Sequence, residues 1–425
     1  MANVEDYLAR GDRDLAVFGP FVKGVNNRLS DAAMGSDMLR QAVNAYLDDA
    51  GRLSRRDGYG KLQNGTAAHS LYAGDEGVYF ADGSTLYAYD VEADTLSALR
   101  TDLTQGSPIA WLPLNGELYY ANGVQKGKIV ASALRDWGVE VPAGIPALAA
   151  TTGVLTPGRR EVVCTFTNDE GEESGAGLST GITLAATGGI TVSSIPQPVS
   201  AEVAQINLYM TPANGDGVFY HAVSVPVGTA SISLFSLSPT KELKTQFLVP
   251  PPAGRVLAYA NGRIYAGDGR ILWYTEPLAY GRCAVYRNFL VFNEEVTLAA
   301  GVKGGLYVAA DKTYFLAGEP GAAELTPVLN YGAAFGSLAP VPTSANKAGA
   351  VWTWRSDRGQ VLADERGQIV PLQEENLAMK PCSTGASLFV EVDGHKQIVS
   401  LGVPETDSSA EARDFVSMEV RRRTA

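Results

Sequence analysis

The sequence repeats one short pattern that only a few folds can accommodate. In each copy, a glycine-containing turn leads into a short strand rich in Tyr, Leu and Val, and most copies then turn into a second strand. A hairpin this small cannot bury both of its faces, so it has to stack on further copies of itself. Six copies occupy residues 77–89, 116–123, 262–274, 304–316, 349–362 and 385–392.

The spacing of the copies indicates a circular arrangement. Except across one gap, they fall about 40 residues apart, the period of a propeller blade. Each copy resembles the middle hairpin of a four-stranded blade, and a ring of blades leaves only short, protected edges. We therefore predict an all-β chain, a β-propeller of about six or seven blades. A set of unrelated β-meanders is the alternative that the pattern leaves open.

The gap between the second and third copies predicts a separate domain. Linker-like segments rich in proline bound it at residues 142–146 and 250–252. Alternating strands at this spacing over about 100 residues are typical of a fibronectin-type β-sandwich. The predicted domains are an N-terminal arm or strap (1–62), the first propeller blades (63–142), an inserted fibronectin III-like β-sandwich (143–252), and the remaining blades with a closing C-terminal strand (253–425).

The two ends of the chain carry further local signals. Ser36 is a suitable N-cap for a short helix with Met38, Leu39 and Ala42 facing inward. A glycine-containing turn after Leu47 then predicts a hairpin. Near the C-terminus, a last strand is expected to pair with residues 16–22 and close the ring. The Arg residues at 421–423 are interpreted as a solvated tail rather than a phosphate contact.

Charge and cysteine content exclude several classes of protein. The formal net charge of −12 argues against tight nucleic-acid binding, which requires a basic surface, although an acidic wall would let DNA pass without adhering. Solubility alone explains the acidity equally well. Cys164, Cys283 and Cys382 lie far apart, which predicts neither disulfides nor zinc and fits a reducing cytoplasm. Neither a signal peptide nor a membrane span is predicted.

Residues that could perform catalysis occur without the spacing that catalysis requires. His69, His221 and His395 belong to no recognisable catalytic motif, so structural roles are expected for all three. The acidic turn at 169–173 lacks the spacing of an EF-hand loop. The turn at 356–359 faintly resembles the Asp-box of sialidase propellers, but it occurs once and with the wrong spacing. We therefore predict a protein that is not an enzyme, with no catalytic, cofactor-binding or metal-binding residues.

Two parts of the chain resemble known phage proteins. The first comprises Gly24-Val25-Asn26-Asn27, residues 39–44 and residues 49–59, and it is similar to the opening strap of short-tailed phage nozzle proteins. That family includes tail tubular protein B and the packaged-DNA stabilisation proteins. The chain departs from the family pattern by placing Ala50 between Asp49 and Gly51. The second comprises residues 258–265, 274–281, 304–308 and 313–318, and it is similar to propeller segments of phage tail proteins.

The resemblance implies a structural protein of the virion tail, made in the host cytoplasm. Such a protein would form a homo-oligomeric ring, usually a hexamer, below the portal and adaptor proteins. The ring would continue the DNA channel, retain packaged DNA with only non-specific passage of the genome, and anchor tail fibres or spikes. The strap residues that would contact a neighbouring subunit are Asn26, Asn27, Arg55, Arg56 and Tyr59. The same strap would equally well pack under its own propeller.

Two other functions remain open from the sequence. One is a propeller that binds or cleaves glycans at the host surface, which predicts clustered carboxylates and exposed aromatic residues in a concave pocket. Trp352 and Trp354 alternate along a strand in a way that permits this, although core packing explains them better. The other is a fibre-anchoring hub near the tail tip of a long-tailed phage.

Overall fold

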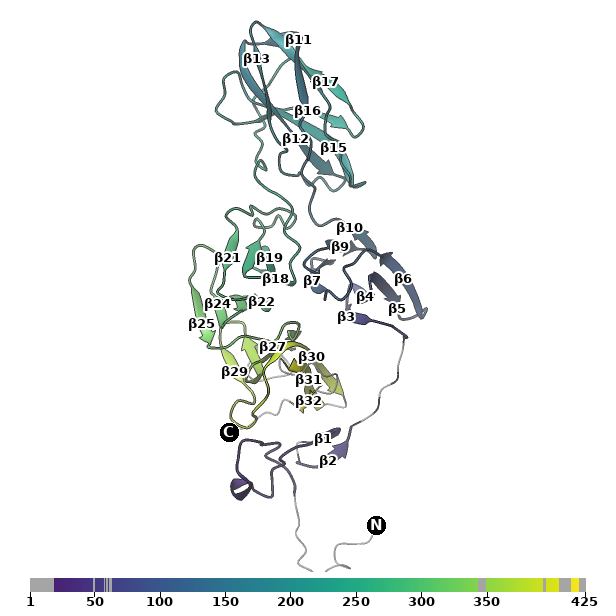
Figure 1. The fold of residues 1–425 in the computed structure, drawn as a ribbon, viewed down its shortest axis with the longest axis vertical. Helices are drawn as coiled ribbons and strands as arrows, with labels where there is room; N and C mark the ends of the chain where they lie inside the picture. Colours follow the sequence, from purple (N-terminus) through teal and green to yellow (C-terminus); the bar gives the residue numbers. More distant parts are fainter. Residues whose placement is uncertain are drawn as a thin grey trace, which may run out of the picture. The chain divides into compact units, whose positions relative to one another are not determined.

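The computed structural model describes residues 19–48, 50–56, 58, 60, 63–342, 349–392, 395–404 and 414–419. These residues form antiparallel strands and a single short 3-10 helix, η1 (Asp31–Ala33) (Figure 1). They divide into two compact units, one made of residues 1–64 with 327–425 and the other of residues 65–326. In the described part of the chain, no helix has the length and apolar character needed to cross a membrane.

The 65–326 unit contains four sheets in which each strand pairs with the next strand along the chain. This four-stranded antiparallel meander is the form of a propeller blade. The first blade joins β3 (Ala68–Gly74), β4 (Gly77–Asp82), β5 (Thr85–Asp90) and β6 (Thr95–Arg100), and the second joins β7 (Ala110–Leu114), β8 (Glu117–Ala121), β9 (Lys126–Val130) and β10 (Ala133–Arg135).

The third and fourth blades follow the inserted domain. The third joins β18 (Val256–Ala260), β19 (Arg263–Asp268), β20 (Ile271–Tyr274) and β21 (Phe289–Val291), and the fourth joins β22 (Leu298–Val302), β23 (Gly305–Ala309), β24 (Thr313–Leu316) and β25 (Leu325–Leu329). In all four blades, the predicted repeat coincides with the middle strands. The predicted fold class, an all-β propeller with an inserted β-sandwich, is confirmed.

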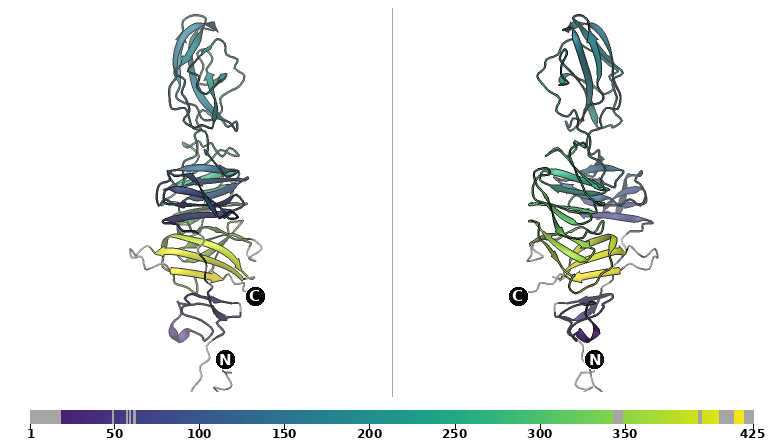
Figure 2. Two further views of the ribbon diagram at one scale, coloured as in Figure 1. Left: turned by 90° about the vertical axis from the view of Figure 1, so that its right-hand side faces the viewer. Right: turned by 60° about the vertical axis from the view of Figure 1, so that its left-hand side comes forward.

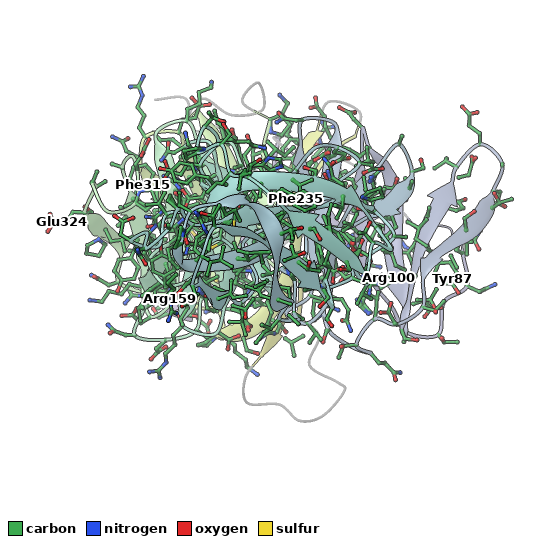
Figure 3. The ribbon with its side chains drawn as sticks, turned by 90° about the horizontal axis from the view of Figure 1, so that it is seen from above. Tyr87, Arg100, Arg159, Phe235, Phe315 and Glu324 are labelled. Carbon is green, nitrogen blue, oxygen red and sulfur yellow. The ribbon has the colours of Figure 1, made fainter. Side chains whose placement is uncertain are left out.

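Neighbouring blades of this unit pack through their inner strands and through aromatic side chains. Strand β18 lies against β7 on one side and against β22 on the other. Tyr79 and Tyr120 are buried in one core that the first two blades share. Arg100, labelled in Figure 3, donates a 2.8 Å hydrogen bond to the hydroxyl of Tyr120 and so links the end of β6 to β8. Burial of these apolar faces is what a lone hairpin could not achieve.

The other unit contains two further blade sheets. One joins β26 (Ala339–Pro340), β27 (Ala350–Ser356), β28 (Gly359–Asp364) and β29 (Ile369–Pro371). The other has three described strands, β30 (Cys382–Val392), β31 (His395–Pro404) and β32 (Asp414–Glu419), drawn in yellow in Figure 2. Strand β30 lies against β26 and β27, and Trp354 is fully buried.

One expectation for this unit was wrong. The sixth repeat copy forms the first strand of its sheet, β30, rather than a middle hairpin. Strand β32 pairs with β31, with Gly402 opposite Asp414. The predicted pairing of the last strand with residues 16–22 stays a prediction, because residues 16–18 lie outside the described residues. The described part of that segment bonds within the arm, because the amide of Phe21 donates to Gly51 O (2.7 Å).

The inserted domain is a sandwich of a three-stranded and a four-stranded sheet. Its core contains the alternating inward residues of both sheets, including Phe166, Ile190 and Leu208. The four-stranded sheet has the order β13–β12–β15–β16, and the three-stranded sheet has the order β11–β14–β17. The strands are β11 (Ala147–Leu155), β12 (Gly158–Asn168), β13 (Thr180–Leu184), β14 (Gly188–Ser193), β15 (Val203–Met210), β16 (Tyr220–Pro226) and β17 (Ser231–Leu234).

The N-terminal arm contains the predicted hairpin but not the predicted helix. Strands β1 (Ala45–Leu47) and β2 (Leu53–Arg55) pair antiparallel. The chain forms a turn at Ser36 and Asp37, and Leu39 then forms a parallel bridge with Val25 instead of facing inward on a helix. A partner distant in sequence therefore outweighs the local capping signal, as weak helix propensity allows.

Candidate functional site

The residues that carry the resemblance to nozzle straps come together in the arm. The amide of Asn26 donates to Leu39 O (2.8 Å), and the amide of Leu39 donates to Gly24 O (2.9 Å). Two stretches that are separate in sequence thus form one backbone-bonded unit, which we call the strap, residues 19–56. The described residues of the strap are mostly exposed or half-buried.

Asn26 holds the first turn of the strap. Its side chain is buried, and its Oδ1 accepts the amides of Arg28 (3.0 Å) and Leu29 (3.1 Å). The guanidinium of Arg40 donates to Leu29 O at 2.8 Å and pairs with Asp31. Because short amide side chains readily cap their own backbone in this way, Asn26 has a structural role within the strap.

Gly51 is required in the turn between β1 and β2. Its φ of +75° lies in the left-handed region, and a Cβ placed there would lie 2.6 Å from the amide nitrogens of Phe21 and Val22. Only glycine permits both the dihedral and the close approach.

Asn27 docks the strap on a turn that follows β29. Its side chain makes two hydrogen bonds with the backbone of Ala378: Nδ2 donates to the carbonyl (3.0 Å), and Oδ1 accepts the amide (2.6 Å). The amide of Asn27 also donates to Asn376 O at 3.1 Å. A carboxamide that bonds both polar groups of one residue reproduces the pairing of two β-strands. We call this contact the Asn27 dock.

Electrostatics add to the dock. The hydrogen bond from Arg358 holds the pKa of Glu374 below its ordinary value, and the charge of Arg28 in the strap lowers that pKa further. Among the remaining predicted strap residues, Arg55 is exposed and Arg56 is half-buried, and Tyr59 lies outside the described residues. The structure therefore brings Asn26 and Asn27 to the blade of their own chain.

A second site joins the inserted sandwich to the blades, and the sequence did not reveal it. The acidic turn at 169–172, which lacks calcium-loop spacing, meets cations from two blades. Lys128 on β9 bridges Glu117 (2.8 Å) and Glu170 (2.9 Å), with its side chain only 11% exposed. Burial opposes the charge of Lys128, but these hydrogen bonds outweigh that effect and raise its pKa. We call the whole contact the sandwich joint.

Two arginines complete the sandwich joint. Arg135 at the end of β10 pairs with Asp169 and lies 3.6 Å from both Glu170 and Glu202. The hydrogen bond from Arg135 lowers the pKa of Asp169, whereas burial raises the pKa of Glu202. Arg282, from the third blade, lies 3.9 Å from Glu172.

Glu173, directly after the acidic turn, is hydrogen-bonded inside the sandwich. Glu173 Oε1 accepts hydrogen bonds from Thr165 (2.6 Å), Tyr209 (2.7 Å) and Asn207 (3.1 Å). The turn is therefore anchored on both sides, and a networked contact of this kind positions domains more firmly than isolated surface pairs. The sequence carries one signal for this contact, because Lys128 lies next to the apolar pair Ile129-Val130 in the last stretch before the insert.

The histidines do not form a catalytic cluster in the described structure. His69 Nδ1 lies 2.9 Å from the hydroxyl of Ser70. His221 Nε2 lies 2.9 Å from the hydroxyl of Ser224, and its ring contacts Tyr209 edge-on. Burial lowers the pKa of His221. The side chain of His395 lies outside the described residues.

Lys126 is a half-buried residue where the two linkers of the sandwich leave the blades. Its Nζ donates to Pro251 O in the returning linker and lies 5.6 Å from the ring centre of Trp137 in the outgoing one. Burial lowers the pKa of Lys126 to about 8, and the charges of Cys283 and Asp136 oppose that shift. Trp137 Nε1 in turn donates to Tyr280 O (2.8 Å), which fixes the outgoing linker to the third blade.

We expect Lys126→Met to change how the stability of the 65–326 unit depends on pH. Because the pKa of Lys126 is about 8 in the folded chain and 10.5 ordinarily, the unfolded chain binds more protons between these values, so the stability contribution of Lys126 rises with pH there. The difference in unfolding free energy, variant minus wild type, should therefore fall by up to about 3 kcal/mol from pH 7 to pH 10.5. Urea titrations at both pH values measure it, and a constant difference would contradict the prediction.

Comparisons with known proteins identify no family. No family model and no curated protein matches this sequence. Among solved structures, BBS1N in complex with ARL6DN is 9% identical, has a TM-score of 0.32, and is matched over 81% of this chain and 92% of that one. The N-terminal domain of Nup159 is 11% identical with a TM-score of 0.29, over 79% of this chain and 73% of that one. Hsv2 of Kluyveromyces lactis is 8% identical with a TM-score of 0.26, over 84% and 95%. Scores this low carry no argument about function.

Proposed function

We propose that this chain is a non-catalytic structural protein of a bacteriophage tail. It assembles as a homo-oligomeric ring, a hexamer, that continues the DNA channel below the portal and adaptor proteins. The ring retains packaged DNA and anchors tail fibres or spikes. The observation that carries the proposal is that the strap residues resembling nozzle proteins form one docked element on a propeller blade.

The sandwich joint supports this mechanical role. Lys128, Arg135 and Arg282 hold the inserted sandwich through a network rather than through a single flexible linker. A sandwich held in this way can transmit force from a bound fibre to the blades without changing its orientation. The formal net charge of −12 is compatible with a channel wall that repels phosphates, so DNA would slide without adhering.

We expect purified wild-type protein to form rings and to be a component of purified virions. Mass photometry gives the mass of the assembly, and electron microscopy of particles labelled with an antibody to this chain places it on the tail. A protein that stays monomeric at micromolar concentration and is absent from virions would overturn the proposal. A positive glycan array from such a monomer would support the glycan-binding alternative instead.

A further inference from the structure

The last strands of the four-stranded blade sheets differ in how their free edges are protected. An unpaired strand edge exposes backbone amides and carbonyls, and proteins usually block it with proline, charge or a β-bulge. Strands β25 and β29 contain Pro327 and Pro371, and β6 pairs with a register shift at Leu86 and Tyr87. Strand β10 ends at Arg135, which belongs to the sandwich joint. Among these described strands, β21 alone carries neither proline, charge nor a register shift.

Strand β21 presents two apolar side chains and their backbone groups at its free edge. It is the last strand of its sheet and pairs only with β20 there (Figure 1). Phe289 is 39% exposed and Val291 is 62% exposed. On either side of them, the carbonyl of Asn288 (3.0 Å) and the amide of Phe292 (2.9 Å) bond across to the β20 side. Because antiparallel pairing alternates from residue to residue, the amides and carbonyls of Phe289 and Val291 point away from β20.

Residues beside this edge indicate the chemistry of a strand that would cover it. Tyr286 is 59% exposed and Phe247 is 66% exposed, and their rings meet edge-on with centres 6.5 Å apart. Arg287, two residues before Phe289, pairs with Glu276 at 3.1 Å, yet its side chain remains 58% exposed. A guanidinium has five N–H donors, so Arg287 can bind a second carboxylate. The edge therefore offers apolar contacts along its length and open guanidinium donors at its N-terminal end.

We propose that β21 is a strand-addition site for an extended peptide segment of a partner protein, with apolar side chains at alternate positions and an acidic residue at its C-terminal end. An antiparallel peptide brings its C-terminal end to the N-terminal end of β21, where Arg287 lies. Backbone hydrogen bonds to Phe289 and Val291 hold the peptide, and its apolar side chains cover theirs. This site goes beyond the proposed function and does not depend on ring formation.

Binding of a synthetic peptide to the full-length chain tests the site. The probe is fluorescein-labelled, C-terminally amidated TVTVTE, in which valines alternate and the glutamate comes last. We expect saturable binding by fluorescence polarisation. Val291→Pro should weaken it about tenfold or more, because proline removes an outward amide while the hydrogen bonds to β20 remain. The matched variant Val291→Thr keeps the amide and the branched shape, so its affinity should stay within about threefold of the wild type.

A second measurement uses only the wild-type chain and so does not depend on the folding of Val291→Pro. Two forms of TVTVTE are compared, one N-methylated on its valines and the other on its threonines. Only one of these two sets of amides can face β21, so one form should bind about tenfold or more weakly than the other. Equal affinity of the two forms would refute strand addition. Absence of binding by unmodified TVTVTE would refute it as well.

The remaining outcomes test the charge and the identity of the occupant. TVTVTK should bind about threefold more weakly than TVTVTE, as expected for an exposed ion pair, and equal affinity would overturn the acidic end of the peptide. If Val291→Pro abolishes self-association of the chain while TVTVTE does not bind, a second copy occupies the edge and the proposal is refuted. Peptide binding by a chain that forms no ring would support this site and contradict the proposed function.

Discussion

Gly301→Val is expected to destabilise the 65–326 unit by roughly 3–5 kcal/mol, among the largest effects of any single substitution in it. Gly301 lies in β22, where this inner strand packs against β18. A Cβ at this position would be 1.7 Å from the carbonyl oxygen of Tyr259 and 2.6 Å from its carbonyl carbon. Because those atoms belong to the backbone, the two blades would have to move apart. Urea denaturation followed by tryptophan fluorescence measures the loss.

A matched control separates this clash from the general cost of replacing a strand glycine. Gly181 lies in β13 of the same unit, and the atom nearest to an added Cβ is the side-chain Nη2 of Arg159, at 3.3 Å. A flexible side-chain end can move aside, so Gly181→Val should change the stability by less than about 1 kcal/mol. Equal losses of stability at the two positions would show that the clash between the inner strands does not account for the effect of Gly301→Val.

The second large effect is expected at the sandwich joint. Lys128→Met should lower the free energy of unfolding by about 3–5 kcal/mol, because it leaves Glu117 and Glu170 without their shared cation. The turn at 169–172 should also exchange its amide hydrogens faster, since Lys128, one of its two ion-pair anchors on the second blade, is lost while Arg135 remains. Denaturant titration and hydrogen exchange by mass spectrometry measure the two effects.

Two further variants test whether the loss comes from unpaired charge. Adding Glu117→Gln and Glu170→Gln to Lys128→Met removes both carboxylate charges and should restore most of the stability. Arg159→Met removes an ion pair whose arginine side chain is 67% exposed, so it should change the stability by less than about 1 kcal/mol. If the triple variant were no more stable than Lys128→Met, lost packing rather than charge would explain the effect.

Elements that depend on neighbouring residues were predictable from the sequence, whereas elements that depend on distant partners were not. The blade hairpins were predictable because the turn glycines and the strand residues lie next to each other in the chain. The helix predicted after Ser36 is absent, although Ser36 is a good N-cap, because the chain there forms a turn and a bridge. There the competing partner of Leu39 is Val25, whose position no local pattern encodes.

The candidate sites also combine residues that the sequence indicates with contacts between distant segments that it does not. Asn26 and Asn27 were singled out from the sequence, but their contacts with a turn some 350 residues away in the chain were not. The acidic turn at 169–172 matches no motif, so the sequence assigns it no role. The role of this turn depends on Lys128, Arg135 and Arg282. These residues come from two blades that the inserted domain separates along the chain.

The sequence by itself therefore determined that this chain is all-β, that its hairpins form blades, and that a sandwich interrupts them. Those properties follow from the residues of the turns and from hairpins that are too small to bury both of their apolar faces alone. Only the tertiary structure decided where the strap docks, how the sandwich is held, and which strand β32 pairs with. These choices depend on hydrogen bonds and ion pairs between distant segments, and the energies of such contacts exist only once the segments have been brought together.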